Sequence, residues 1–421
     1  MEPARCLADS PVNKRVRVRA SPRKSLLGVS ELSSGHGREV VIVEAVRTPI
    51  GRGHKEKGYY SDAHPNELLG KTYTEVIARA GIDPAEVEDV ICGCVQQYGE
   101  QMFNVGRNAW LQAGLPIETP ATTVDRQCGS AQQAVNFGAA LIAAGVHDTV
   151  IGGGVEHMGH IPMGVGFNWV DQVGSPWPPE LLERYNLVPQ GLSAEMIADQ
   201  WEIPRSELDE LAVRSHQRAA KATEEGRFER EIVPMQVNGD TYATDQGIRP
   251  ETSLETLSQL KPAFRSDGKI TAGNSSQISD GAASVLLMAR ERAEVLGLTP
   301  RARIVDQTTV GVDPVIMLTG PIPATRKLLE RNGMKIDDID LVEINEAFAP
   351  VVAAWRRELE PDMDRVNVNG GAMALGHPLG STGARLITTL LHELERSGKE
   401  TGLVTMCCGG GLGTGTLIQR V

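Results

Sequence analysis

The chain repeats a pattern of residues in its two halves. "AGIDPAEVEDVI" (80–91) and "NGMKIDDIDLVE" (332–343) both contain a helix end, a glycine break, a short acidic turn and an apolar strand. "TVIGGGVE" near residue 150 is matched by "MCCGGGLG" near residue 406. Because the members of each pair are separated by roughly 250 to 260 residues, the sequence predicts a duplicated unit rather than an array of short repeats.

Each unit alternates β-branched runs with Ala- and Leu-rich stretches. Residues 135–154 and 385–411 both read as a helix, a turn, a strand and a glycine-rich loop. This alternation predicts an α/β fold built from parallel βαβ units with a buried sheet. The Ala-rich helices are apolar on most sides, so we expect at least one helix of each half to lie between sheets.

Residues from about 157 to 278 interrupt the first unit. Their first part is rich in Gly, Pro and Trp and reads as an ordered loop. Two helices follow, and we expect the second to start at a capping box near Ser206. An insertion of this length usually covers an active site or builds an interface.

Composition excludes several classes of function. A net charge of −12 disfavours nucleic acid as a partner, and no apolar run reaches the roughly 20 residues that a membrane span requires. The six cysteines of the chain do not form a disulfide framework and have no zinc-site spacing, so we expect no metal and a reducing compartment, taken as cytoplasmic. Residues 1–38 are rich in Arg, Lys and Ser and are predicted to be a disordered tail, with a transit peptide as the alternative.

Cys128 stands in "VDRQCGSAQQA" (124–134), where a helix is predicted to begin. A thiol at the positive end of a helix dipole should have a lowered pKa, and the small Gly129 and Ser130 beside it would let an acyl group approach. A buried structural cysteine is the alternative interpretation.

His377 lies between Gly376 and Pro378 in "NGGAMALGHPLGSTGAR" (369–385). The proline restricts the backbone of His377 to extended geometry, which is typical of a positioned imidazole that acts as a general base. An isolated histidine is more often a packed residue without a chemical role.

Two further motifs place polar groups at strand ends. In "VEINEAFAP" (342–350), Asn345 could orient a water or polarise a carbonyl, or the polar pair with Glu346 could cap a helix. In "TMCCGGGLGTG" (405–415), Cys407 and Cys408 precede three glycines. Those glycines could offer backbone N–H groups as an oxyanion hole or could serve tight packing.

These four segments, together with "EHMGHIP" and "ITAGNSSQISDGAA" (270–283), resemble the motifs of the thiolase family, in the same order and over residues 39–421. The resemblance implies an α/β fold of duplicated βαβαβαββ halves that form a layered α-β-α-β-α core with an inserted loop domain. It places the N-terminal half at 39–298, with the insertion at 157–278, and the C-terminal half at 299–421. Asp125, Ala131, Gly159 and Thr382 depart from the usual residues of the family, and none of these departures removes a catalytic group.

The resemblance also implies residue roles. Cys128 would be the acylated nucleophile, His377 would take its proton, and Cys407, rather than Cys408, would move the proton at the acetyl α-carbon. Asn345 would hold a water that stabilises the thioester enolate, and the N–H groups of Cys128 and Gly409 would form the oxyanion hole. The residues implied to contact CoA or the acyl group are Ser276, Ala272, Phe348, Ala347 and Met158.

The implied function is CoA-dependent thiolytic cleavage of 3-ketoacyl-CoA to acetyl-CoA and a shortened acyl-CoA, as in β-oxidation, or the reverse Claisen condensation. CoA and acyl-CoA would be substrates, with no bound cofactor, and the assembly would be a homodimer or homotetramer. A catalytically silent acyl-CoA-binding scaffold is one alternative. A ketoacyl synthase-like condensing enzyme is another, but it would pair its cysteine with His–His or His–Asn rather than with a second cysteine.

Overall fold

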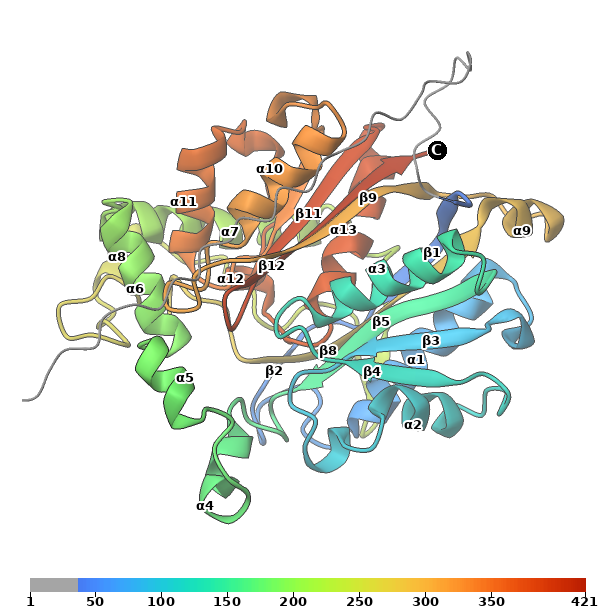
Figure 1. The fold of residues 1–421 in the computed structure, drawn as a ribbon, viewed down its shortest axis with the longest axis horizontal. Coiled ribbons are helices and arrows are strands. Elements are labelled where there is room, and N and C mark those ends of the chain that lie inside the picture. Colours follow the sequence, from blue (N-terminus) through green and yellow to red (C-terminus); the bar gives the residue numbers. More distant parts are fainter. Residues whose placement is uncertain (1–36) are drawn as a thin grey trace, which may run out of the picture. The chain divides into compact units, whose positions relative to one another are not determined.

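The computed structural model describes residues 37–421 (Figure 1). The predicted basic tail, residues 1–38, therefore lies outside the described residues except for its last two positions. Of these, Arg38 is attached to the folded chain. Its backbone N–H donates to the carbonyl oxygen of Ala143 over 3.1 Å, and its guanidinium forms an ion pair with Asp148 at 2.6 Å.

The core of the fold is a mixed sheet with the strand order β10-β11-β12-β9-β1-β8-β5-β3-β4. The strands of its first half are β1 (Val40–Arg47), β3 (Asp89–Gly93), β4 (Ala121–Val124), β5 (Thr149–His157) and β8 (Ser279–Ala289), and the two-residue β2 (Gly51–Arg52) pairs with β8. The strands of its second half are β9 (Ala302–Gly311), β10 (Leu341–Ile344), β11 (Thr401–Cys408) and β12 (Leu412–Arg420). Within the sheet, the two halves are joined by the pairing of β1 with β9, at Val41–Arg303 and Ile42–Ala302.

The two halves share one topology, which confirms the predicted duplication. In the first half, β3 pairs in parallel with β4 and β5, whereas β8 pairs antiparallel with β5 and β1. In the second half, β10 pairs in parallel with β11, and β12 pairs antiparallel with β11 and β9. Val366 bridges to Val342 in parallel where β4 would lie in the first half. The sheet is therefore mixed rather than parallel throughout, and its parallel strand pairs lie within the βαβ units.

Helices α3 (Ser130–Ala143) and α13 (Thr382–Ser397) contact each other and form the middle layer of the fold. α3 packs on β3, β5 and β8 and reaches β12, whereas α13 packs on β10 and β11 and reaches β1 and β8. Residues 382–394 of α13 are all buried, as expected for a helix between sheets.

Other helices cover the outer faces (Figure 1). α1 (Pro65–Ala80) and α2 (Val105–Gln112) pack on the first half of the sheet, whereas α10 (Pro321–Arg331) packs on the second half and against α11 (Ala349–Leu359). The succession of helix and sheet layers confirms the predicted layered α/β fold.

The insertion runs between the paired strands β5 and β8. It contains α4 (Val170–Val173), α5 (Pro179–Arg184), α6 (Gln190–Gln200), α7 (Arg205–Glu224), α8 (Leu254–Ser258) and a small hairpin of β6 (Met235–Val237) and β7 (Asp240–Tyr242). The predicted capping box at Ser206 is wrong. Helix α7 begins one residue earlier, after the extended Pro204, and no side chain caps it. The carboxylate of Asp209 instead accepts hydrogen bonds from Arg205 and Asn274.

Candidate active site

The chemistry-bearing residues gather where strands end. Cys128 follows β4, and the C-terminal half supplies Asn345 just after β10 and Cys407 near the end of β11. β10 and β11 are parallel neighbours, paired through Ile344 and Thr405, so Asn345 and Cys407 leave the same edge of the sheet. Ligands of α/β proteins commonly bind at this edge.

A strained turn holds Cys128. The preceding residue, Gln127, has a left-handed backbone with a φ of 50°, and α3 begins two residues after the cysteine. The hydroxyl of Ser130 donates to the carbonyl of Gln127 over 2.6 Å and accepts the N–H of Arg126 over 2.9 Å. These bonds fix the turn, and they hold a thiol that is only 2% exposed.

The Cys128 thiol is neutral at rest. Burial raises its pKa to about 11, although the backbone N–H groups of Gly409 and of Cys128 itself approach the sulfur and lower the pKa. The expectation of a lowered pKa is therefore wrong, because loss of water outweighs the effect of these two N–H groups. A neutral thiol needs a base beside it before it can attack a carbonyl.

His377 has the protonation state of such a base. The hydroxyl of Thr382 donates to the carbonyl of Pro378 over 2.8 Å, and at 2.6 Å we therefore assign it as the acceptor of the proton on Nδ1 of His377. This assignment leaves a lone pair on Nε2, toward which the Asn345 amide nitrogen points at 3.2 Å. Burial, and then the charge of Arg385, lower the His377 pKa to about 3, so the imidazole is neutral.

A buried carboxylate anchors the loop that carries His377. Glu156, near the end of β5, accepts the backbone N–H groups of Val95 and Gly380, each over 2.9 Å. A Cβ atom at position 380 would lie 2.4 Å from the carbonyl oxygen of Val155, so only glycine fits there. Glu156 thus ties the His377 loop to the N-terminal half. At the start of the loop, the His377 N–H donates to the Ser279 hydroxyl over 3.2 Å.

Cys407 and Cys408 differ in their surroundings. The Cys408 sulfur interacts with the N–H of Gly129 and the hydroxyl of Thr414, and a Cβ atom on Gly129 would come within 2.7 Å of it. The small residue after Cys128 therefore makes room for Cys408. Burial raises the pKa of Cys407 well above its usual value, so this thiol is neutral as well.

The residues predicted to contact CoA divide into two groups. The Ser276 N–H donates to the Ala347 carbonyl over 3.0 Å, and Ser275 bridges to Phe348, so both segments lie side by side. Ala272 is exposed on the first of these segments. Met158 is not part of this group. It belongs to the buried cluster that contains Cys128, and it lines a groove of about 590 Å³.

The sequence pattern of the thiolase N-terminal domain matches residues 40–291, and that of the thiolase C-terminal domain matches residues 298–420. The chain belongs to the thiolase family. Two relatives align with nearly the whole of this thiolase. The steroid 3-ketoacyl-CoA thiolase FadA6 of Mycobacterium tuberculosis is 46% identical over 404 residues, which cover 94% of this chain and 98% of that protein. A 3-ketoacyl-CoA thiolase of Aeromonas salmonicida is 45% identical over 394 residues, which cover 91% of this chain and 100% of that protein.

A crystal structure of the Bacillus anthracis acetyl-CoA acetyltransferase has the same fold. It matches this thiolase with a TM-score of 0.84 and 41% identity, over 92% of this chain and 100% of that chain. Among residues 37–421 of this thiolase, no three His, Cys, Asp or Glu side chains are grouped as metal ligands would be.

Sequence reasoning missed two residues that shape the site, Glu156 and Ser279. Glu156 is a lone carboxylate in a Gly-rich strand whose nine residues are all buried. A buried charge requires hydrogen-bond partners, so such a residue could have been predicted to anchor a neighbouring segment. Ser279 lies within the motif at 270–283, but nothing in that motif predicts its contact with His377, which joins residues 98 positions apart.

Proposed function

We propose that this thiolase, an acyltransferase, cleaves 3-ketoacyl-CoA with CoA into acetyl-CoA and a shortened acyl-CoA, or runs the reverse condensation. The observation that carries the proposal is the neutral His377, whose Nδ1 proton is held by Thr382 and whose Nε2 lone pair faces the Asn345 amide nitrogen, where it can accept a proton. The names of the two relatives, both 3-ketoacyl-CoA thiolases, support the substrate class.

In the first half of the proposed reaction, the Cys128 thiol gives its proton to Nε2 of His377 and its sulfur attacks the 3-keto carbon. The backbone N–H groups of Cys128 and Gly409, both close to that sulfur, stabilise the oxyanion. The C2–C3 bond then breaks, which leaves an acyl group on Cys128 and the enolate of acetyl-CoA. Asn345, through a water, and His377 stabilise the enolate, and Cys407 protonates its carbon.

In the second half, the thiol of free CoA attacks the acyl-Cys128 thioester. The CoA proton restores the Cys407 thiol, and His377 returns its proton to the departing Cys128 sulfur. The shortened acyl-CoA leaves, and both cysteines are thiols again. Two sulfurs therefore suffice, one to carry the acyl group and one to carry a proton.

We assign the paired segments around Ser276, Ala272, Ala347 and Phe348 to the CoA moiety. Met158 would face the acyl group, because it packs in the same buried cluster as Cys128 and also lines the neighbouring groove. That groove, whose other lining residues include Pro162, Met163 and Ile278, has the volume of a small-molecule site. We therefore propose that it receives acyl groups larger than an acetyl group.

The division into halves at residues 298 and 299 is also a proposal, supported by the family patterns that end at 291 and begin at 298. A role in fatty acid β-oxidation, a cytoplasmic location and assembly as a homodimer or homotetramer are further proposals, drawn from the family resemblance. No helix among residues 37–421 combines the length and apolar character needed to cross a bilayer.

The test is a thiolysis assay on the purified full chain with acetoacetyl-CoA, a medium-chain and a bulky 3-ketoacyl-CoA. We expect CoA-dependent release of acetyl-CoA, a higher kcat/KM for the two larger substrates, and no turnover by the Cys128→Ala variant. Absence of acetyl-CoA from all three substrates would contradict the proposed activity. A preference for acetoacetyl-CoA would contradict only the assignment of the groove.

A further inference from the structure

A buried ion pair joins the strand that leads to Asn345 and the helix whose first residue holds His377. Nη1 of Arg385 is 3.4 Å from the carboxylate of Glu343, and both side chains are nearly inaccessible, at 2% and 4% exposure. Arg385 is on α13, three residues after Thr382, the residue that holds Nδ1 of His377. Glu343 is on β10, two residues before Asn345, and therefore on the same face of the extended chain.

We propose that the Glu343–Arg385 pair is a positioning device. It fixes the strand that presents Asn345 against the helix that orients His377. It also places a positive charge near the imidazole. The inference rests on the proposed thiolase reaction, because it assigns a task to residues that do not touch substrate. The pair joins the two elements whose ends meet at the contact between Asn345 and Nε2 of His377.

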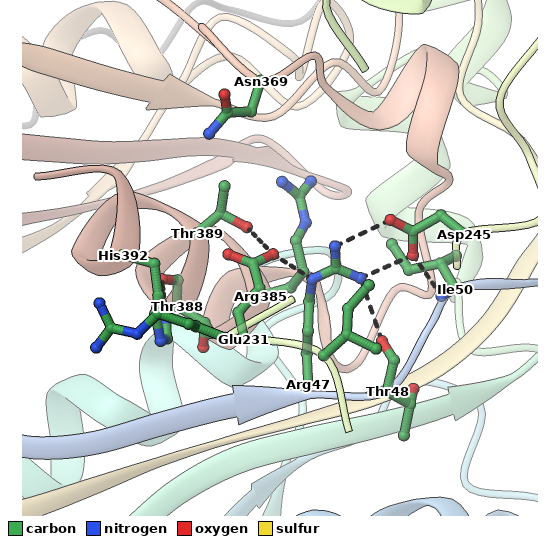
Figure 2. A network of polar contacts seen from close by, with 12 residues as sticks. Arg47, Thr48, Ile50, Glu231, Asp245, Asn369, Arg385, Thr388, Thr389 and His392 are labelled. Atoms are coloured by element: carbon green, nitrogen blue, oxygen red, sulfur yellow. Dashed lines mark hydrogen bonds and ion pairs between the residues drawn. The ribbon is translucent and has the colours of Figure 1, made fainter. Parts of the chain in front are cut away.

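The same helix is held a second time, one turn further on. The hydroxyl of Thr389 donates to Glu231 over 3.0 Å, and Glu231 pairs with Arg47 at 2.6 Å. Arg47 also forms two bonds with Asp245, at 2.7 and 2.9 Å. Figure 2 shows Arg385 beside this network. The charged groups that act on Arg385 thus include Glu343 from β10, Glu346 just after it, Arg47 from β1, and Glu231 and Asp245 from the insertion.

Stability alone does not explain this arrangement. Nε and Nη2 of Arg385 are buried without a hydrogen-bond partner among residues 37–421, and buried ion pairs often stabilise a fold no better than apolar residues of the same size. A positive charge near His377, in contrast, has a chemical consequence. It disfavours the imidazolium form, and Arg385 is the charged group that lowers the His377 pKa, after burial. The base is therefore kept free, and it readily returns the proton that it takes from Cys128.

The experiment compares Arg385→Met, Arg385→Lys and the double variant Glu343→Gln/Arg385→Met in the thiolysis assay, with a melting temperature for each. The double variant removes both charges, so that no unpaired ion remains buried. The control is Arg301→Met. Arg301 also forms a largely buried ion pair, with Glu395. It lies just before the start of β9, whereas β12 connects the opposite end of β9 to Cys407.

We expect Arg385→Met and the double variant to lower kcat by about tenfold or more, with KM changed by less than about twofold. In both variants the acidic limb of the pH profile of kcat/KM should move to higher pH, because loss of the positive charge raises the His377 pKa. Arg385→Lys keeps the charge and should keep the wild-type limb. The control should have wild-type kinetics.

Wild-type kcat and an unmoved acidic limb in a folded double variant would overturn the inference, and so would an equal effect of Arg301→Met. If Arg385→Met does not fold, the double variant and Arg385→Lys decide the matter by the same readouts. Failure of the wild-type protein to cleave any 3-ketoacyl-CoA would instead refute the proposed function, so the two failures are distinguishable.

Discussion

At the scale of single residues, the site depends on protons held in place by neighbours. Cys128 keeps its proton because burial raises its pKa to about 11, and His377 stays unprotonated because burial lowers its pKa to about 3. A neutral thiol and a neutral imidazole are the protonation states from which the proposed proton transfer starts. Thr382 decides which imidazole nitrogen receives that proton.

Replacement of Thr382 by valine removes the acceptor for Nδ1 and frees the other tautomer. We expect kcat to fall by about tenfold or more, since a lost buried hydrogen bond costs about 1–3 kcal/mol. Thr382→Ser keeps the hydroxyl and is the matched control, with kcat near the wild-type value. Steady-state thiolysis measures both variants. An equal loss in the valine and serine variants would show that the methyl group matters rather than the hydroxyl.

At the scale of secondary-structure elements, the crossing of α3 and α13 brings the two halves together. Gly383 lies at this crossing, where a Cβ atom would come within 2.3 Å of the backbone nitrogen of Gln132. Because backbone atoms cannot move aside as a flexible side chain can, even a methyl group must shift one of the helices. The helix that carries Thr382 therefore depends on a glycine at its second position.

We expect Gly383→Ala to lower the free energy of unfolding by about 1–3 kcal/mol, the usual cost of overpacking a core. Gly311→Ala is the control, since a Cβ atom at position 311 meets open space. Urea denaturation compares the two variants. If Gly383→Ala is as stable as the wild type, the crossing is looser than the structure indicates.

Helix α13 also buries a histidine with no role in the proposed chemistry. Nδ1 of His392 contacts the Thr388 carbonyl at 2.9 Å, and burial lowers its pKa to about 3. The unfolded chain binds a proton here near pH 6.5, so the contribution of neutral His392 to stability is complete above that pH and is lost as the pH falls. We expect the stability advantage of the wild type over His392→Gln to shrink by about 3 kcal/mol from pH 7 to pH 4. An advantage that is constant with pH would contradict this.

At the scale of the whole molecule, the fold consists of two similar halves, and the candidate site forms where the two halves meet. The repeated segments near residues 80 and 332 predicted the two halves. Apolar periodicity shows which face of each element is buried, so segments with the same pattern are expected to form the same structure. The patterns around Cys128, Asn345 and Cys407 marked segments that the fold carries to strand ends, and the pattern around His377 marked the loop before α13. The start of α7 was predicted wrongly, because Asp209 bonds to Arg205 and Asn274 instead of capping the helix.

What the sequence could not predict are properties that depend on distant partners. The pKa of Cys128 was expected to be low from its place before a helix, but burial by groups from both halves raises it. Glu156 reaches Gly380 across 224 positions of the chain, and Arg385 reaches Glu343 across 42. No local pattern encodes such contacts.

The central claim is that one thiol, Cys128, carries the acyl group while Cys407 moves a proton. Incubation of the full chain with acetyl-CoA, followed by digestion and mass spectrometry, locates the acetyl group directly. We expect it on Cys128 in the wild type and in Cys407→Ala, and nowhere in Cys128→Ala. An acetyl group on Cys407 or Cys408, or a Cys128→Ala protein that is labelled as fully as the wild type, would contradict the account.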